Sequence, residues 1–118
     1  MTDGPLSPGR VTIERYDDAR IVSLHGEHDI GTEDLVRERL ADARGAAGPI
    51  VVDLTAATFI DSFIVAALID AYRADTPPRL RVVARAGTAP RELFDLVRFE
   101  DIAPVFEQLE DALAEHRG

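Results

Sequence analysis

The sequence predicts an α/β domain with a mixed, mostly parallel sheet of four to five strands, an N-terminal hairpin and about four helices. Two observations support this fold class. Two apolar runs separated by a short polar turn open the chain, and from residue 32 onward helical periodicities alternate with short apolar runs. An opening hairpin forms an antiparallel pair, whereas strands that alternate with helices form parallel sheets with helical cover.

Residues 1–10 are expected to form a flexible leader, and residues 11–118 a single domain. Glycine and proline occupy four of the ten leader positions, and both residues interrupt regular structure. The leader lacks a basic stretch followed by an apolar core, so a secretory signal is not expected. A chain of 118 residues is long enough to bury roughly two-thirds of its unfolded surface in one core.

The N-terminal half predicts a hairpin, a helix and a central strand. Residues 11–13 and 19–24 read as strands around a turn at residues 16–18. A polar connection over residues 26–31 is then expected to lead to Thr32, a candidate N-cap for the first helix. The apolar stripe of that helix is Leu35, Val36, Leu40 and Ala43. The continuous apolar run over residues 49–54 suits a strand that is covered on both faces.

The C-terminal half predicts three helices and two strands. A helix over residues 61–75 is stopped by a proline pair, and a strand follows at residues 80–84. The third helix is capped by Thr88 and followed by a short edge strand within residues 102–106, and residues 108–117 form the last helix. The apolar stripe of the third helix is Leu93, Phe94 and Val97.

Composition excludes several classes of function. The net charge of −9 disfavours nucleic acid and anionic membranes as main partners, because both reward clustered Lys and Arg. The chain has no cysteine, so disulfides and thiolate metal sites are impossible. No apolar run approaches the roughly 18 residues that a membrane-spanning helix needs. A cytoplasmic protein without a cofactor is therefore expected.

The most informative segment is residues 50–65, in which an apolar strand, a polar turn and a second apolar pair lead into Asp61 and Ser62. These two residues open a predicted helix. A carboxylate, a hydroxyl and free backbone N–H groups thus meet at one helix N-terminus. This arrangement suits a regulatory phosphate or a docking contact. Asp61 can equally be a simple N-cap, and the capping and binding roles are compatible.

Catalytic and metal-binding interpretations are weaker. Asp53 and Asp61 could form a pair for acid–base chemistry, but no His, Lys or Cys falls between residues 50 and 65 to complete a reactive set. His25, His28 and Asp29 could begin a metal site, but no further ligand is evident. The chain also lacks a phosphate-binding glycine loop and a nucleophile elbow. It is therefore expected not to be an enzyme.

The chain resembles STAS domains, the family that includes bacterial anti-sigma factor antagonists and the cytosolic domains of sulfate transporters. The central pattern is an apolar strand ending in Asp53-Leu54, followed by Phe59-Ile60-Asp61-Ser62 at a helix start. Weaker matches precede and follow it in the expected order. They are Leu24-x-Gly26-Glu27-x-Asp29-Ile30, Leu93-Phe94-x-x-Val97 and Val105-Phe106.

The resemblance implies a partner and a switch. Such proteins bind an anti-sigma factor that is also a serine kinase with a GHKL-type fold, and phosphorylation at the helix N-terminus breaks the complex. In the family pattern Asp-Ser-Ser/Thr-Gly the second hydroxyl is phosphorylated. That position here is Phe63, and Ile64 stands in place of the glycine. Ser62 is the remaining candidate acceptor.

The sequence therefore predicts a partner-binding surface made of six residues and leaves three questions open. Phe63 is either an exposed anchor or a core residue, and the first helical turn is either covered by a loop or exposed. The protein is either an anti-sigma factor antagonist-like module or a scaffold subunit, such as a homodimer, of a larger signalling or transport assembly. The predicted surface is Asp29, Asp61, Ser62, Phe63, Ile64 and Val65.

Overall fold

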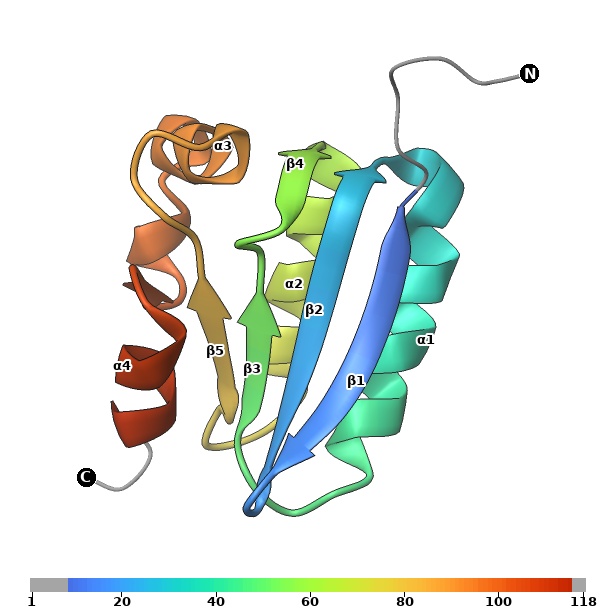
Figure 1. Ribbon diagram of the computed structural model, residues 1–118, viewed down its shortest axis with the longest axis vertical. Helices are drawn as coiled ribbons and strands as arrows, with labels where there is room; N and C mark the ends of the chain where they lie inside the picture. Colours follow the sequence, from blue (N-terminus) through green and yellow to red (C-terminus); the bar gives the residue numbers. More distant parts are fainter. Residues whose placement is uncertain (1–8, 116–118) are drawn as a thin grey trace.

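The computed structural model describes residues 9–115 of the chain, with six strands and four α-helices in that range (Figure 1). Two short 3₁₀ helices, η1 and η2, precede α1 and β6. The elements in order are β1 (Arg10–Tyr16), β2 (Ala19–His28), η1 (Ile30–Thr32), α1 (Glu33–Arg44), β3 (Ile50–Asp53), β4 (Ala57–Ile60), α2 (Ser62–Arg73), β5 (Leu80–Val83), α3 (Ala89–Val97), η2 (Phe99–Asp101), β6 (Val105–Phe106) and α4 (Leu109–Glu115).

The sheet is mixed and mostly parallel, as the sequence predicts. Its strand order is β1-β2-β3-β5-β6, and β4 lies off this path, paired with β2. The hairpin pair β1–β2 is antiparallel, and every other pair is parallel. The long strand β2 therefore pairs with β3 along its first half and with β4 along its second.

The strand β4 was not expected, and the sheet has six strands in the described range instead of four to five. The expectation of a polar connection from residue 26 was also wrong, because β2 continues to His28. At Gly26 the register between β2 and β4 shifts, and this residue has a φ of 82°. Such a φ strains any residue with a side chain, so glycine permits the bulge that carries β2 onward.

Helices cover the two faces of the sheet unequally. In Figure 1, α1 and α2 lie together behind the strands, α4 lies beside β5, and α3 lies at the end of the sheet near β4. Successive residues of β3 point to opposite faces, so Val52 joins the main core with α1 and α2, whereas Val51 joins a smaller cluster with Ala112 of α4. The central strands are therefore apolar on both faces, as the continuous run in the sequence predicts.

Several boundaries differ from those expected. The strand β1 begins at Arg10, which was assigned to the leader; the rest of that expected leader falls almost entirely in residues 1–8, outside the described residues. The edge strand β6 has only two residues. Val97 was placed in the apolar stripe of α3, but it is exposed, because α3 ends at this residue and only its Phe94 side reaches the core. The expected last residues of α4 fall in 116–118, outside the described range.

The ring pair Phe94–Phe99 joins α3 to η2 within the main core. Both rings are fully buried, and they stack with their centroids 4.3 Å apart. We expect Phe94→Ala to lower the free energy of unfolding by about 3–5 kcal/mol, because it removes the stack and leaves a cavity. Urea denaturation measures this loss. Phe63→Ala is the matched control; since Phe63 is partly exposed, an equal loss in both variants would contradict this account.

Candidate functional site

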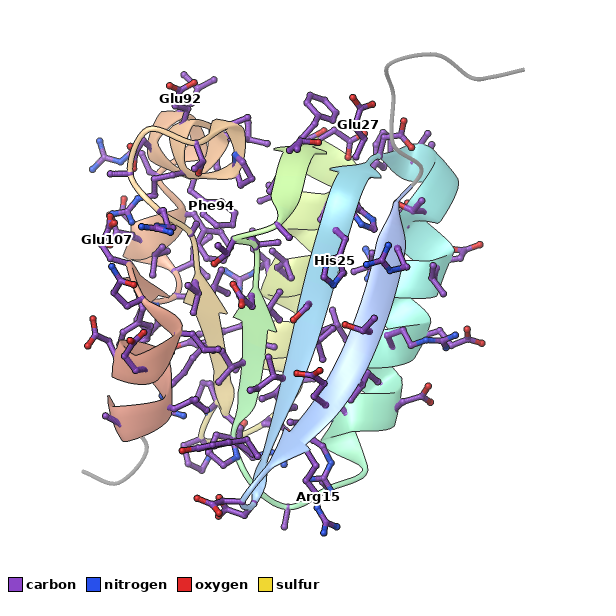
Figure 2. The ribbon with its side chains drawn as sticks, in the orientation of Figure 1. Arg15, His25, Glu27, Glu92, Phe94 and Glu107 are labelled. Atoms are coloured by element: carbon purple, nitrogen blue, oxygen red, sulfur yellow. The ribbon has the colours of Figure 1, made fainter. Side chains whose placement is uncertain are left out.

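The site lies where β2 and β4 end. His28 and Ile60 are register partners in this parallel pair, so Asp29 and Asp61 leave the sheet side by side as the next residues of each strand. Figure 2 shows Glu27 at this end of the sheet and Arg15 at the opposite, hairpin end. Ligands of open α/β sheets commonly bind at the carboxyl ends of parallel strands. The structure thus brings together two residues that are 32 positions apart in the sequence.

Both aspartates are helix caps. Asp61 Oδ1 accepts hydrogen bonds from the backbone N–H of Phe63 and Ile64, at 3.0 and 3.2 Å. Asp29 Oδ1 accepts one from the N–H of Gly31 at 2.8 Å, and this starts η1. The capping alternative for Asp61 is therefore correct. In both residues Oδ2 makes no hydrogen bond within residues 9–115, so each carboxylate keeps one oxygen for another contact.

One side of the first turn of α2 lies in the core and the other side faces solvent. Ile64 and Val65 are 0% and 5% exposed, whereas Ser62 and Phe63 are exposed. The expectation that Ile64 and Val65 belong to a contact surface was therefore wrong. Residues at these positions face the sheet together with the residues one turn later, Ala67 and Leu68. The sheet itself covers the apolar turn.

Phe63 is an exposed residue and does not belong to the core. It is 44% exposed, next to Ser62, whose hydroxyl makes no hydrogen bond to any residue from 9 to 115. Two further apolar side chains are exposed at the same end of the sheet, Ile30 in η1 and Phe59 in β4. We call the set Asp29, Ile30, Phe59, Asp61, Ser62 and Phe63 the strand-end surface.

Sequence reasoning missed Phe59 and Ile30 as surface residues. The signal for Phe59 was its place beside Ile60, because neighbouring residues of a strand point to opposite faces and Ile60 is buried. Phe59 is the register partner of Glu27, so these two side chains lie on the same face of the sheet. An apolar group is thus bordered by carboxylates, an arrangement that favours a partner with apolar and basic side chains.

His28 is the only polar or charged side chain that is fully buried in the described part of the chain. Its Nδ1 lies 3.0 Å from Thr32 Oγ1, and its Nε2 lies 3.0 Å from the His25 carbonyl oxygen. Burial lowers the pKa of His28, while hydrogen bonding to the backbone of His25 and Arg10 and the charge of Asp29 oppose that shift. The ring is therefore neutral at pH 7.

The metal and acid–base interpretations find no support in the geometry. Both nitrogens of the His28 ring are engaged within the protein, and within residues 9–115 no three His, Asp or Glu side chains gather in a way that could hold a metal. Asp53 Oδ1 accepts a hydrogen bond from the N–H of Thr55 at 2.9 Å, which shapes the turn between β3 and β4. Asp53 is thus a turn residue. No helix in the described range is long and apolar enough to cross a membrane.

These features define a small α/β domain with a mixed apolar and acidic surface at the ends of its parallel strands. Residues 10–112 match the family model of the STAS domain. The chain belongs to the STAS domain family, as its motifs predicted. No match was found among curated proteins.

Solved structures agree with this assignment. An anti-sigma factor antagonist from Mycobacterium paratuberculosis is 27% identical, with a TM-score of 0.87 over 94% of this chain and 96% of that one. The phosphorylated form of the Bacillus cell fate determinant SpoIIAA is 19% identical, with a TM-score of 0.65 over 90% and 98%. RsbS of Moorella thermoacetica, as a serine-to-glutamate variant, is 21% identical, with a TM-score of 0.72 over 92% and 95%. The last two show likeness of fold alone.

We expect Asp61→Ala to lower the free energy of unfolding by about 1 kcal/mol, because two N–H groups of α2 lose their acceptor. Asp61→Asn should retain most of that stability, since an amide oxygen can still cap the helix. Urea denaturation provides the measurement. The matched control is Ser62→Ala, which removes an unbonded hydroxyl and should change stability by less than about 0.5 kcal/mol. Equal effects of both alanine variants would refute the capping role.

Proposed function

We propose that this protein is a non-catalytic, cytoplasmic antagonist that docks an anti-sigma factor of the GHKL kinase type through the strand-end surface. The observation that supports this most strongly is the exposed ring of Phe63 at the N-terminus of α2. Aromatic side chains at the centre of an apolar patch are frequent anchors of protein interfaces. The 27%-identical mycobacterial structure is that of an anti-sigma factor antagonist, and this likeness supports the choice of partner.

Position 63 also bears on regulation. In the family pattern this position carries the hydroxyl that is phosphorylated, and a phenylalanine has no acceptor for phosphate. A phosphoryl group would add about −1.5 to −2 charges at pH 7 and disrupt an apolar contact by repulsion and desolvation. With Phe63 in its place, binding does not depend on ATP. We therefore propose that the amount of this protein, and not its phosphorylation, sets how much partner is sequestered.

We expect Phe63→Asp to abolish docking. The substitution places a charge where the partner would pack against the ring, and loss of an anchor of this kind costs at least about 2 kcal/mol, or roughly 30-fold in affinity. The measurement is a pull-down from the source organism with identification by mass spectrometry, followed by titration calorimetry with the purified anti-sigma factor. Tyr16→Asp is the matched control, because Tyr16 is also exposed but lies at the hairpin end of the sheet.

Three outcomes of this experiment are informative. Retention of a GHKL-type protein by the wild type and Tyr16→Asp, but not by Phe63→Asp, supports the proposal. Equal binding by all three removes Phe63 from the interface. A stable homo-oligomer that dissociates only in Phe63→Asp, as seen by size-exclusion chromatography with light scattering, favours the scaffold interpretation instead.

We expect the wild-type protein to take up no phosphate at residues 62 or 63 from its partner kinase, whereas Phe63→Ser should become phosphorylated at position 63. The substitution restores a hydroxyl at an exposed position beside the positive end of α2, which stabilises a phosphate. The measurement is incubation with the purified kinase and ATP, with the modified residue mapped by mass spectrometry. Stoichiometric phosphate on Ser62 of the wild type would overturn the ATP-independent part of the proposal.

A further inference from the structure

The buried ring of His28 lies directly beneath the strand-end surface. It precedes Asp29 in the chain, and its register partner on β4 is Ile60, which precedes Asp61. Gly9 covers the ring from the side: a Cβ at this glycine would come within 2.7 Å of His28 Cε1 and 2.8 Å of its Nδ1. The ring is thus enclosed by Gly9, the end of β2 and the turn that leads to α1.

The hydrogen bonds of the ring determine its tautomer. The carbonyl oxygen of His25 can only accept, so Nε2 of His28 must carry a proton. In a neutral ring Nδ1 is then unprotonated and accepts the hydroxyl proton of Thr32 across 3.0 Å. This bond fastens Thr32 to the interior of the domain. The backbone N–H of Thr32 in turn donates to the Asp29 carbonyl oxygen at 2.9 Å, which closes the turn of residues 29–32.

Protonation of the ring would rearrange this network. Nδ1 would become a donor, so the Thr32 hydroxyl would have to accept from it and direct its own proton elsewhere. The available acceptor is the Asp29 carbonyl oxygen, 3.3 Å away. A charged ring without solvent contact is also unfavourable, and it regains water only if the turn or Gly9 moves. The charge state of His28 and the geometry of the turn are therefore coupled.

We propose that His28 is a positioning residue whose neutral ring holds the turn of residues 29–32 so that Asp29 and Ile30 are presented on the strand-end surface, and that protonation of this ring releases the turn. This inference rests on the proposed function, because it assigns a role in docking to a residue that touches no partner. It adds a regulatory property to that surface: docking weakens as the pH falls.

The groups around the ring set the direction of the effect. Desolvation lowers the pKa of His28 below its ordinary value of about 6.5. The backbone carbonyls of His25 and Arg10 and the charge of Asp29 favour the protonated form, and a charge on His25 opposes it; β4 contributes the uncharged Ile60, and α1 the Thr32 hydroxyl at its start. The neutral ring is therefore fully populated at pH 7.5, and the turn is released as the pH falls below about 6.5.

The test follows the amide signals of Gly31 and Thr32 by nuclear magnetic resonance from pH 8 to pH 4. We expect a chemical-shift step with a midpoint below about 6.5 in the wild type and its loss in His28→Gln, which does not titrate. His25→Gln is the matched control and should retain the step. At pH 7.5 the nitrogen shifts of the His28 ring should show the tautomer with the proton on Nε2. The amide of Val52 in the central strand reports on global unfolding and should not change with these signals.

Three results would overturn the inference: no step in the wild type, a step that survives in His28→Gln, or a His28 ring that carries its neutral proton on Nδ1. His28→Leu tests the positioning role further, because it keeps a buried apolar volume but cannot bond Thr32. In His28→Leu the amide signals of Gly31 and Thr32 should be displaced even at pH 8. If this variant fails to fold, the pH titration of His28→Gln still tests the inference. All signals come from the free protein, so the release of the turn can be refuted while the docking proposal stands. If docking fails instead, the same signals still show whether the turn is released, but the effect loses its role in docking.

Discussion

The ten-residue strand β2 pairs with two strands in succession, and the whole site depends on this double pairing. After β3 ends, the chain turns and β4 resumes the pairing farther along β2, past a bulge that Gly26 permits with its positive φ. Asp29 and Asp61 then emerge together at the end of the sheet. Without the second half of β2, the cap of α2 and the turn before α1 would not start from the same end of the sheet.

Packing of α2 against the sheet explains why one side of its first turn is buried and the other side is exposed to solvent. The helix inserts Ile64 and Val65 into the core, and these contacts set its rotation. Ser62 and Phe63 must then face solvent, since they lie on the opposite side of the same turn. Because one side of the turn is buried, the other side is exposed to solvent. The exposure of Phe63 is therefore a consequence of core packing and not of a mobile segment.

The same few groups would serve both the stability of the fold and the proposed docking. The caps formed by Asp29 and Asp61 satisfy backbone N–H groups with one oxygen, and the other oxygen makes no hydrogen bond to the residues that the structure describes, so each residue can serve the fold and a partner together. The His28 ring connects this edge to the interior of the domain. A surface supported in this way is preorganised, which reduces the ordering cost of binding. In this STAS domain, position 63 carries a phenylalanine, and the proposed docking would then be controlled by protein amount and pH and not by ATP.

The sequence by itself determined the fold class, the family and the placement of Asp61 and Ser62 at a helix start, because periodicity and capping are local properties of consecutive residues. It also showed that position 63 carries a phenylalanine, which has no hydroxyl to accept a phosphate. Only the tertiary structure decided that β4 exists, that Ile64 and Val65 are buried while Phe63 is exposed, and that His28 lies inside. The physical reason is that an apolar side chain becomes core or surface according to what packs over it, and those neighbours come from strands and helices far away in the chain.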